Sequence, residues 1–205
     1  MKSLYRLPLN ATPEQAARLL ALQQVFAQAC NALAPLAART RVWNRVALHH
    51  MAYKSLREQF PALGSQMVCN TIYSVSRICR QVYQHPESPY GLGVVGKAPL
   101  PVLRFTENCP VYFDRHTLSL KDGQLSLFTL SGRTHFRIGP PQEVPDLLSL
   151  RLREIVLGRS AGAFELSFLF ASPQAREQSA VGEADDAAPC GRPDIPDYVM
   201  VEETT

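Results

Sequence analysis

The stretch TLSLKDGQLSLFTLSGRTHFRI, residues 117–138, decides the fold, because its apolar residues recur at almost every second position. This period of two is typical of β-strands that bury one face of a sheet. Lys121-Asp122-Gly123 and Ser131-Gly132 interrupt the pattern where hairpin turns are expected. The stretch therefore predicts an antiparallel meander of short strands.

Further strand patterns lie on both sides of this meander. Residues 3–9 alternate, although Pro8 restricts them to an edge strand or ends the strand. The other predicted strands are 102–105, 111–113, 150–157 and 164–170, with a turn at 158–162. Regular short strands joined by such turns predict a small antiparallel barrel, and with the helices that precede them an α+β fold.

Three helices are predicted between the first strand and the rest. Thr12-Pro13-Glu14-Gln15 has the form of a capping box, and Pro35 is expected to kink or end the helix that follows. A second helix is predicted for residues 42–60, with a buried stripe formed by Val46, His49, Tyr53, Leu56 and Phe60. The third begins at Ser65; its core side holds Ile72, Val75, Ile78, Cys79 and Val82, and its opposite side holds Asn70, Ser74, Arg77 and Arg80.

The chain divides by composition into five segments. These are a first strand (1–10), a helical region (11–84), a linker rich in Pro and Gly (85–100), the β-barrel (101–170) and a flexible acidic tail with a short apolar end (171–205).

Charge is distributed unevenly along the chain. Residues 171–205 contain eight acidic and two basic residues, whereas residues 1–170 contain 19 basic and 10 acidic ones, and 17 of the 21 basic residues are arginines. Because the planar Arg side chain grips phosphate in a bidentate manner, a basic body with an acidic tail favours a polyanion binder.

Arginines and aromatic side chains also alternate along the second and third helices and the strands. Arginine pairs with phosphates and aromatic rings stack on bases, which is how RNA is commonly held. Trp43, Tyr53, Tyr83 and Tyr112 belong to this pattern. The predicted RNA-binding residues are Arg6, Arg41, Arg45, Lys54, Arg57, Asn70, Tyr73, Arg77, Arg80, Arg104, Arg115, Arg133 and Arg137.

The sequence contains no motif that indicates catalysis, a metal site or a cofactor. Five cysteines without a CxxC pair predict reduced thiols that act as small apolar side chains. We found no apolar run of about 18 residues and no signal peptide, so a soluble cytoplasmic protein without a membrane partner is expected.

The order of these features resembles the N-terminal half of TnpB proteins, transposon-associated RNA-guided DNA endonucleases related to the CRISPR type V effectors. The resemblance rests on the Thr12–Gln15 helix with Ala29-Cys30-Asn31 downstream, Ser65-Gln66 before the third helix, and the strand pattern from Val111 to Phe170. It implies an oligonucleotide-binding-like barrel, called the wedge, into which a helical recognition lobe is inserted.

The resemblance also implies a function. Wedge and recognition lobe would hold a structured guide RNA, and target DNA would be recognised through base pairing with it. The RuvC-type nuclease domain of the family has no counterpart in the 35 residues after Phe170, so we expect a nuclease-inactive protein. Its partners would be an effector or nuclease subunit in trans, or a second copy of the chain.

Three alternatives remain open at this stage. Helices two and three could form a helix-turn-helix DNA-binding regulator that reads bases with Gln66, Asn70 and Arg77. The chain could also be the N-terminal half of a split RNA-guided nuclease, or a degenerate transposon fragment without activity.

Overall fold

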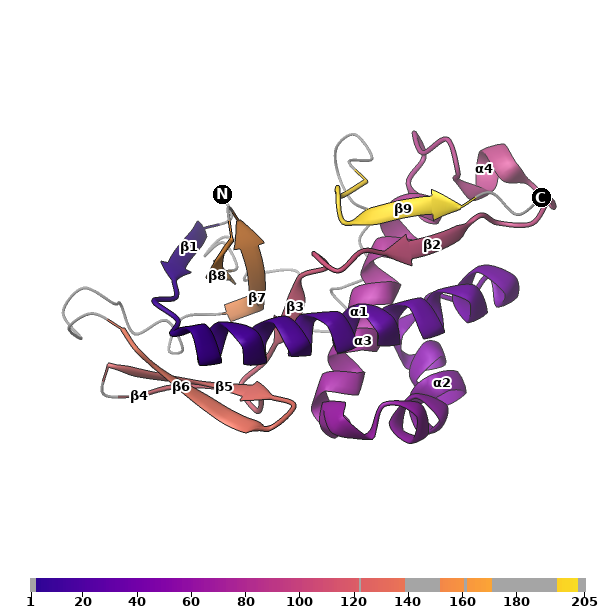
Figure 1. Ribbon diagram of the computed structural model, residues 1–205. Helices are drawn as coiled ribbons and strands as arrows, with labels where there is room; N and C mark the ends of the chain where they lie inside the picture. Colours follow the sequence, from indigo (N-terminus) through magenta and orange to yellow (C-terminus); the bar gives the residue numbers. More distant parts are fainter. Residues whose placement is uncertain (1–2, 122, 139–151, 161, 171–194, 203–205) are drawn as a thin grey trace, which may run out of the picture. The chain divides into compact units, whose positions relative to one another are not determined.

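The structure is a computed structural model that describes residues 3–121, 123–138, 152–160, 162–170 and 195–202 (Figure 1). The chain forms two compact units. The first combines residues 1–23 with 110–185, and the second combines residues 24–109 with 186–205. Each unit therefore contains segments that are far apart in the sequence, and each is described by itself.

The first unit contains a four-stranded antiparallel sheet. Its strands are β1 (Ser3–Pro8), β8 (Ala163–Phe170), β7 (Leu152–Ser160) and β3 (Val111–Phe113), in that order across the sheet. β1 pairs with β8 from Ser3 opposite Phe170 to Pro8 opposite Glu165. The predicted first strand thus joins strands that follow it by more than 140 residues. Leu157, Leu166 and Phe168 are fully buried in this sheet.

A three-stranded antiparallel sheet completes the first unit. It consists of β4 (Leu118–Lys121), β5 (Gln124–Thr129) and β6 (Gly132–Arg137), in the order β4-β5-β6. The turns contain Gly123 and Gly132 at φ 72° and 103°, values that favour glycine. The predicted meander is confirmed, but the described strands form separate sheets and close no barrel. Strand pattern alone does not determine whether neighbouring sheets join.

Helix α1 (Pro13–Thr40) begins at the predicted capping box, which is confirmed. Thr12 N donates to Gln15 Oε1 at 2.8 Å, and Gln15 N donates to Thr12 Oγ1 at 3.3 Å. The helix does not end at Pro35, which was one of the two predicted outcomes, because α1 continues to Thr40. Pro35 is exposed while Leu33, Ala34, Ala37 and Ala38 are buried, so packing of the opposite side offsets the lost backbone hydrogen bond.

Helix α1 is also long and apolar enough to cross a membrane, by length and composition alone. Half of its most apolar 18-residue window is buried inside the protein. A core helix of a soluble protein passes the same test, so the helix gives only weak support for a membrane location.

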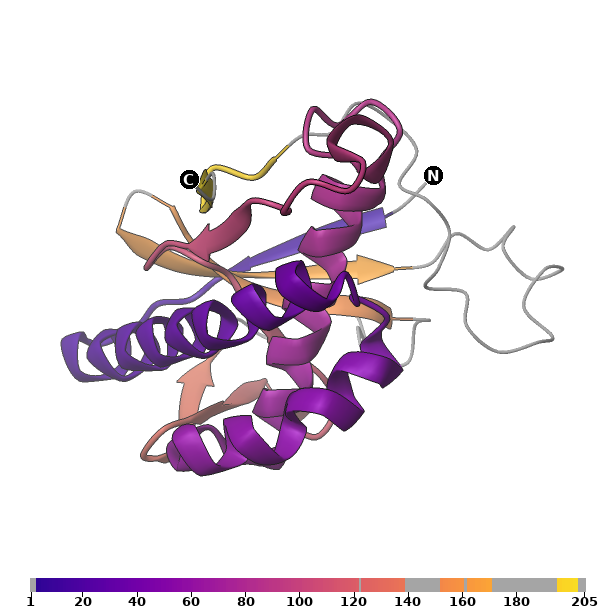
Figure 2. The ribbon, with the colours of Figure 1, turned by 90° about the vertical axis from the view of Figure 1, so that its right-hand side faces the viewer.

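The second unit is built on α2 (Arg45–Gln59) and α3 (Gly64–Cys79), which lie side by side (Figure 2). Asn44 caps α2 by accepting from the backbone N–H groups of Val46 and Ala47. The predicted stripe of α2 is confirmed at Leu56 only: the other buried residues are Leu48 and Ala52, and Val46 is 52% exposed. The predicted core side of the third helix is confirmed: Ile72, Val75, Ile78 and Cys79 on α3 are buried, and so is Val82 in the turn that follows it.

The segment after α3 is folded rather than extended. A π-helical turn at Arg80–Gln84 leads to backbone turns in which Ser88 N donates to His85 O and Gly91 N donates to Ser88 O. A Cβ atom at position 91 would lie 3.0 Å from His85 O and 3.1 Å from Ser88 O, so this close approach favours glycine. The short helix α4 (Leu92–Val95) follows, and Tyr83 donates to Pro101 O at 2.6 Å.

Two strands complete the second unit. β2 (Val102–Phe105) pairs with β9 (Val199–Glu202), which comes from the predicted tail. The apolar end of that tail is therefore a strand, and residues 171–194 and 203–205 of the predicted flexible segment lie outside the described residues.

Candidate nucleic-acid interface

The β4–β6 sheet has one apolar face and one basic face. Leu118, Leu125, Leu127 and Phe136 point to the apolar face and are at most 2% exposed. The opposite face, which we call the basic face, is arranged in three cross-strand rows that follow from the strand pairing. The rows are Lys121–Gln124–Arg137, Ser119–Ser126–His135 and Thr117–Phe128–Arg133.

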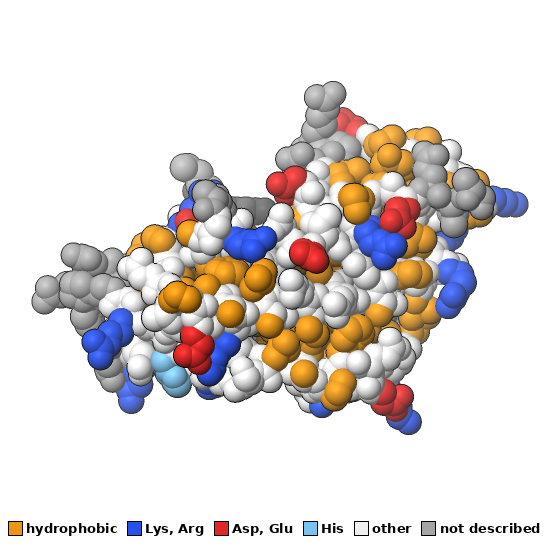
Figure 3. Space-filling model, viewed as in Figure 1, with side chains coloured by type: hydrophobic (Ala, Val, Ile, Leu, Met, Phe, Trp, Pro, Cys, Tyr) orange, Lys and Arg blue, Asp and Glu red, His pale blue; other side chains and the backbone are white. Residues whose placement is uncertain are grey.

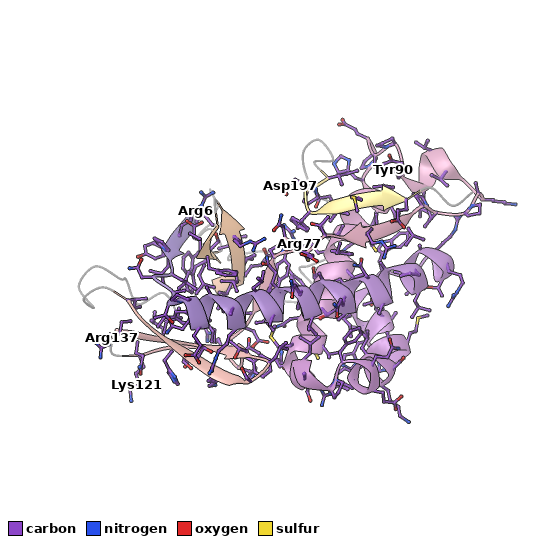
Figure 4. The ribbon with its side chains drawn as sticks, viewed as in Figure 1. Arg6, Arg77, Tyr90, Lys121, Arg137 and Asp197 are labelled. Atoms are coloured by element: carbon purple, nitrogen blue, oxygen red, sulfur yellow. The ribbon has the colours of Figure 1, made fainter. Side chains whose placement is uncertain are left out.

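The basic face carries three cations on a small area. Lys121, Arg133 and Arg137 are exposed, and none of the three strands contains Asp or Glu. Figure 4 shows Lys121 and Arg137 at the same end of the sheet, and Figure 3 shows Lys, Arg and His side chains gathered over these strands. Charges of one sign on strands that contain no acidic residue favour a positive potential, which attracts polyanions.

Arg133 is held across the sheet rather than extended into solvent. It donates through Nη2 to the carbonyl oxygen of His116 at 2.7 Å and through Nη1 to Ser126 Oγ at 3.2 Å. Its guanidinium therefore crosses β5 from β6 toward the turn before β4. A cation fixed in this way loses little side-chain entropy when it binds an anion.

The turn before β4 brings Arg115 and His116 to the same unit. The Asp114 carboxylate shapes this turn by accepting from His116 N at 2.9 Å and from Thr117 N at 3.1 Å. Both Arg115 and His116 are exposed. The contact between Arg133 and the carbonyl of His116 joins the turn to the basic face.

Three of the predicted RNA-binding residues thus belong to this sheet or to the turn before it: Arg133 and Arg137 lie on β6, and Arg115 precedes His116, whose carbonyl oxygen Arg133 contacts. Sequence reasoning missed Lys121, His116 and His135. The alternation of Arg133, His135 and Arg137 along one strand was the available signal for His135. Lys121 lies in the same row as Arg137 only because β4, β5 and β6 pair in this register, and the alternation of residues along a single strand does not predict that register.

Arg6 belongs to the other sheet of the first unit, as Figure 4 shows. It is exposed on β1, where its Nε lies 3.7 Å from the Glu165 carboxylate of β8. Arg6 therefore lies on a different sheet from the basic face, and its charge already faces the Glu165 carboxylate.

The predicted residues around α2 take varied roles. Arg41 donates to the carbonyl oxygens of Gly96 and Ala98, both at 2.6 Å, and Arg57 donates to Pro61 O at 3.4 Å. Arg45 lies over the Tyr73 ring at 5.3 Å, a cation–π arrangement that joins α2 to α3. Lys54 is exposed on α2.

The prediction that one side of the third helix faces solvent is wrong for Asn70 and Ser74. Asn70 and Ser74 were expected on the solvent side, but they are 6% and 1% exposed, and ten of the 16 residues of α3 are buried. Arg77, Arg80 and Tyr73 are half-buried instead of fully presented. The predicted face was shifted because small polar residues fit into helix packing as readily as apolar ones.

The predicted aromatic set is buried in part as well. Trp43, Tyr83 and Tyr112 are at most 9% exposed, and the rings of Trp43 and Tyr83 pack 5.5 Å apart. Burial raises the pKa of Tyr83 well above its usual range. These rings stabilise the interior and leave half-buried Phe128 as the aromatic side chain of the basic face.

Arg104 is exposed on β2, and its Nε donates to Glu202 Oε1 at 3.0 Å. This contact joins the two strands of the β2–β9 pair, so Arg104 belongs to the second unit and not to the basic face.

The thiols are in the interior. Cys30, Cys79 and Cys109 are fully buried, and burial raises the pKa values of Cys30 and Cys79, so both stay protonated at neutral pH. Among the described residues there is no group of three or more His, Cys, Asp or Glu side chains that could hold a metal ion.

A scan against protein-family models finds no match for this chain, and no curated protein is significantly similar to it. Structure and site therefore define it only as an α+β protein with antiparallel sheets.

Proposed function

We propose that this chain binds RNA through the basic face of the β4–β6 sheet. The observation that carries the proposal is the set of three rows, in which Lys121, Arg133 and Arg137 surround Gln124, Ser126 and Phe128 on strands without acidic residues. The cations supply phosphate contacts, the exposed Gln124 side chain supplies hydrogen bonds, and the Phe128 ring supplies a surface for base stacking.

The dimensions of the face suit a nucleic-acid strand. Arg133 and Arg137 are four residues apart on β6, which corresponds to roughly 13 Å at the rise of a β-strand. Lys121 and Arg137 lie two strands apart, or about 10 Å. Phosphates on neighbouring nucleotides of one strand can therefore meet several cations at once.

We further propose that the bound molecule is a structured guide RNA and that the chain acts in RNA-guided DNA targeting or silencing, inside a larger complex. The TnpB resemblance carries this step. The position of β1 supports it, because the first strand joins the late strands β7 and β8 in one sheet, as the wedge arrangement requires. We assign no catalytic step to this chain, and a nuclease or effector subunit would act in trans.

A helix-turn-helix regulator is the competing proposal. The 3₁₀ turn Pro61–Leu63 between α2 and α3 is short enough for that motif. The burial of Asn70 removes one of its three base-reading candidates from contact with a duplex. The basic face therefore has the stronger support.

The chain is first purified from its host together with any bound nucleic acid. That nucleic acid is sequenced and then used as the probe. We compare the wild type with Lys121→Ser/Arg137→Ser and with the control Arg39→Ser/Lys97→Ser, which removes the same charge from exposed positions outside the predicted RNA-binding set. We expect RNA affinity to fall at least 10-fold in the first variant and less than 3-fold in the control.

Two results would overturn the proposal. Equal losses of affinity in both variants would show that only net charge matters. Tighter binding of a DNA duplex than of any RNA, without loss in the Lys121/Arg137 variant, would favour the helix-turn-helix alternative.

A further inference from the structure

On one edge of β2, the backbone hydrogen bonds of Phe105 are made by a side chain instead of a neighbouring strand. Asn31 of α1 accepts from Phe105 N at 2.7 Å through Oδ1 and donates to Phe105 O at 2.9 Å through Nδ2. One amide therefore pairs with both backbone groups of one residue, as a neighbouring strand would. At Phe105, this edge of β2 is therefore closed by a side chain of the second unit.

The other edge of β2 is occupied by β9. Thr106 N donates to Tyr198 O at 2.9 Å, and the register places Arg104 opposite Met200 and Val102 opposite Glu202. Backbone groups alternate in direction along an antiparallel strand, so Val102, Arg104 and Thr106 face β9 while Phe105 faces Asn31. Without β9, the N–H and C=O groups of Val102 and Arg104 and the N–H of Thr106 would lose their partners, whereas Thr106 O would still accept from Cys109 N at 2.9 Å.

The side chains of β9 meet β2 with a defined pattern. Val199 is 6% exposed and lies opposite Phe105, which is 2% exposed, whereas Met200 is 51% exposed. Glu202 accepts from Arg104 Nε at 3.0 Å at the far end of the strand. A strand that binds this edge therefore needs a small apolar residue at the buried Val199 position and an acidic residue at the Glu202 position, whereas the Met200 position accepts any exposed side chain.

We propose that this edge of β2 is a binding site for an extended peptide, which the chain fills with its own residues Ile195–Glu202. A peptide that adds one strand to an exposed edge gains affinity from the backbone hydrogen bonds and specificity from alternate side chains. A two-stranded pair of four residues is marginal by itself, so the strand can detach. The same segment of a second copy is the occupant that fits in trans.

The site is independent of the proposed RNA-binding function, because it lies in the second unit and uses none of the residues of the basic face. Residues 195–202 reach β2 through a connection from β8, so the strand is a tethered ligand. Tethering supplies an effective concentration of roughly millimolar, which an added peptide must overcome.

The experiment uses three full-length chains and one probe. The chains are the wild type, Val199→Asp, which places a charge at the buried position, and the control Met200→Ser, which changes the exposed position of the same strand. The probe is a fluorescein-labelled synthetic peptide with the sequence of Ile195–Thr205, and binding is followed by anisotropy.

We expect the peptide to bind saturably to the Val199→Asp chain and at least 10-fold more weakly to the wild type and to Met200→Ser, in which the edge is already filled. Equal affinity for all three chains, or no saturable binding up to 1 mM, would overturn the proposal.

Hydrogen exchange decides whether Val199→Asp opens the edge or unfolds the unit. Local opening should accelerate exchange of the Arg104 and Thr106 amides and leave the Phe105 amide, which donates to Asn31, protected. Loss of protection at all three amides would show that β9 is an inseparable part of the fold, and the proposal would then be wrong.

Discussion

The Gln15 side chain donates through Nε2 to the carbonyl oxygen of His135 at 2.7 Å while its Oε1 accepts from Thr12 N at 2.8 Å. One amide thus closes the capping box of α1 and satisfies an outward carbonyl of the edge strand β6. Both contacts lie within the first unit, and they tie the start of α1 to the sheet that bears the basic face.

This relationship predicts a graded loss of stability. Gln15→Ala loses both hydrogen bonds and should lower the free energy of unfolding by about 1–2 kcal/mol. Gln15→Glu keeps the acceptor for Thr12 N but loses the donor to His135 O, so about 0.5–1 kcal/mol is expected. Urea denaturation measures both. Glu14→Gln, which removes only an exposed pair with Arg18, should stay within about 0.5 kcal/mol.

RNA binding should depend steeply on salt. Each phosphate contact on a single strand releases about 0.7 counterions, so Lys121→Ser/Arg137→Ser should reduce the slope of log affinity against log salt concentration by roughly 1.4. Fluorescence anisotropy between 50 and 300 mM salt gives the slope. An unchanged slope in this variant would contradict a phosphate contact at either residue.

Arg77 and Arg80 should act mainly on stability. Arg77 is half-buried on α3, most of whose residues are packed, and Arg80 is half-buried at the start of the π-helical turn, so Arg77→Ala/Arg80→Ala removes side-chain packing as well as charge. We expect a loss of about 1–2 kcal/mol in the free energy of unfolding and a change of RNA affinity below 3-fold. Unchanged stability with a large loss of affinity would move the RNA site to α3.

Stability should decline in alkaline solution. Burial raises the pKa values of Cys30, Cys79 and Tyr83 in the folded state, so the unfolded chain releases these protons at lower pH. The stabilisation is fully present below the unfolded pKa values, near 8.5 for Cys and 10 for Tyr, and is lost as pH rises toward the folded values.

Each deprotonating group then costs about 1.4 kcal/mol per pH unit. Denaturation between pH 7 and 10.5 measures this decline. The Cys79→Ala variant should have a lower free energy of unfolding at pH 7, and that free energy should fall less steeply with pH than in the wild type. A stability that is constant up to pH 10.5 would show that these groups do not control it.

The chain alone should not cut DNA. Incubation with magnesium, the copurified RNA and matching single- or double-stranded DNA should leave the substrate intact, because our proposal assigns no catalytic acids to this chain. Magnesium-dependent cleavage that persists through repeated purification, and that follows the protein peak, would contradict this prediction.

Local structure could be predicted from the sequence where local chemistry decides it. The capping box at Thr12, the strands Val102–Phe105 and Val111–Phe113 and the core side of α3 were all confirmed. These features depend on a few neighbouring residues, so their physical cause is contained in the pattern itself.

Features that depend on distant partners could not be predicted. Asn70 is polar and was expected in solvent, but its burial depends on what packs against α3. The continuation of α1 past Pro35 depends on the buried side of that helix. Lys121 and Arg137 share a row of the basic face only because β5 lies between them, which is a property of the sheet.

The pairing of β1 with β8 has a consequence for the order in which the chain folds. Translation at about 5–20 residues per second separates Pro8 from Ala163 by roughly 8–30 s. During that interval β1 has no strand to pair with, whereas α2 and α3 can already pack together. The nascent chain therefore carries β1 unpaired, with Tyr5 and Leu7, until β8 has been made, and chaperones that hold extended apolar segments would find their target there.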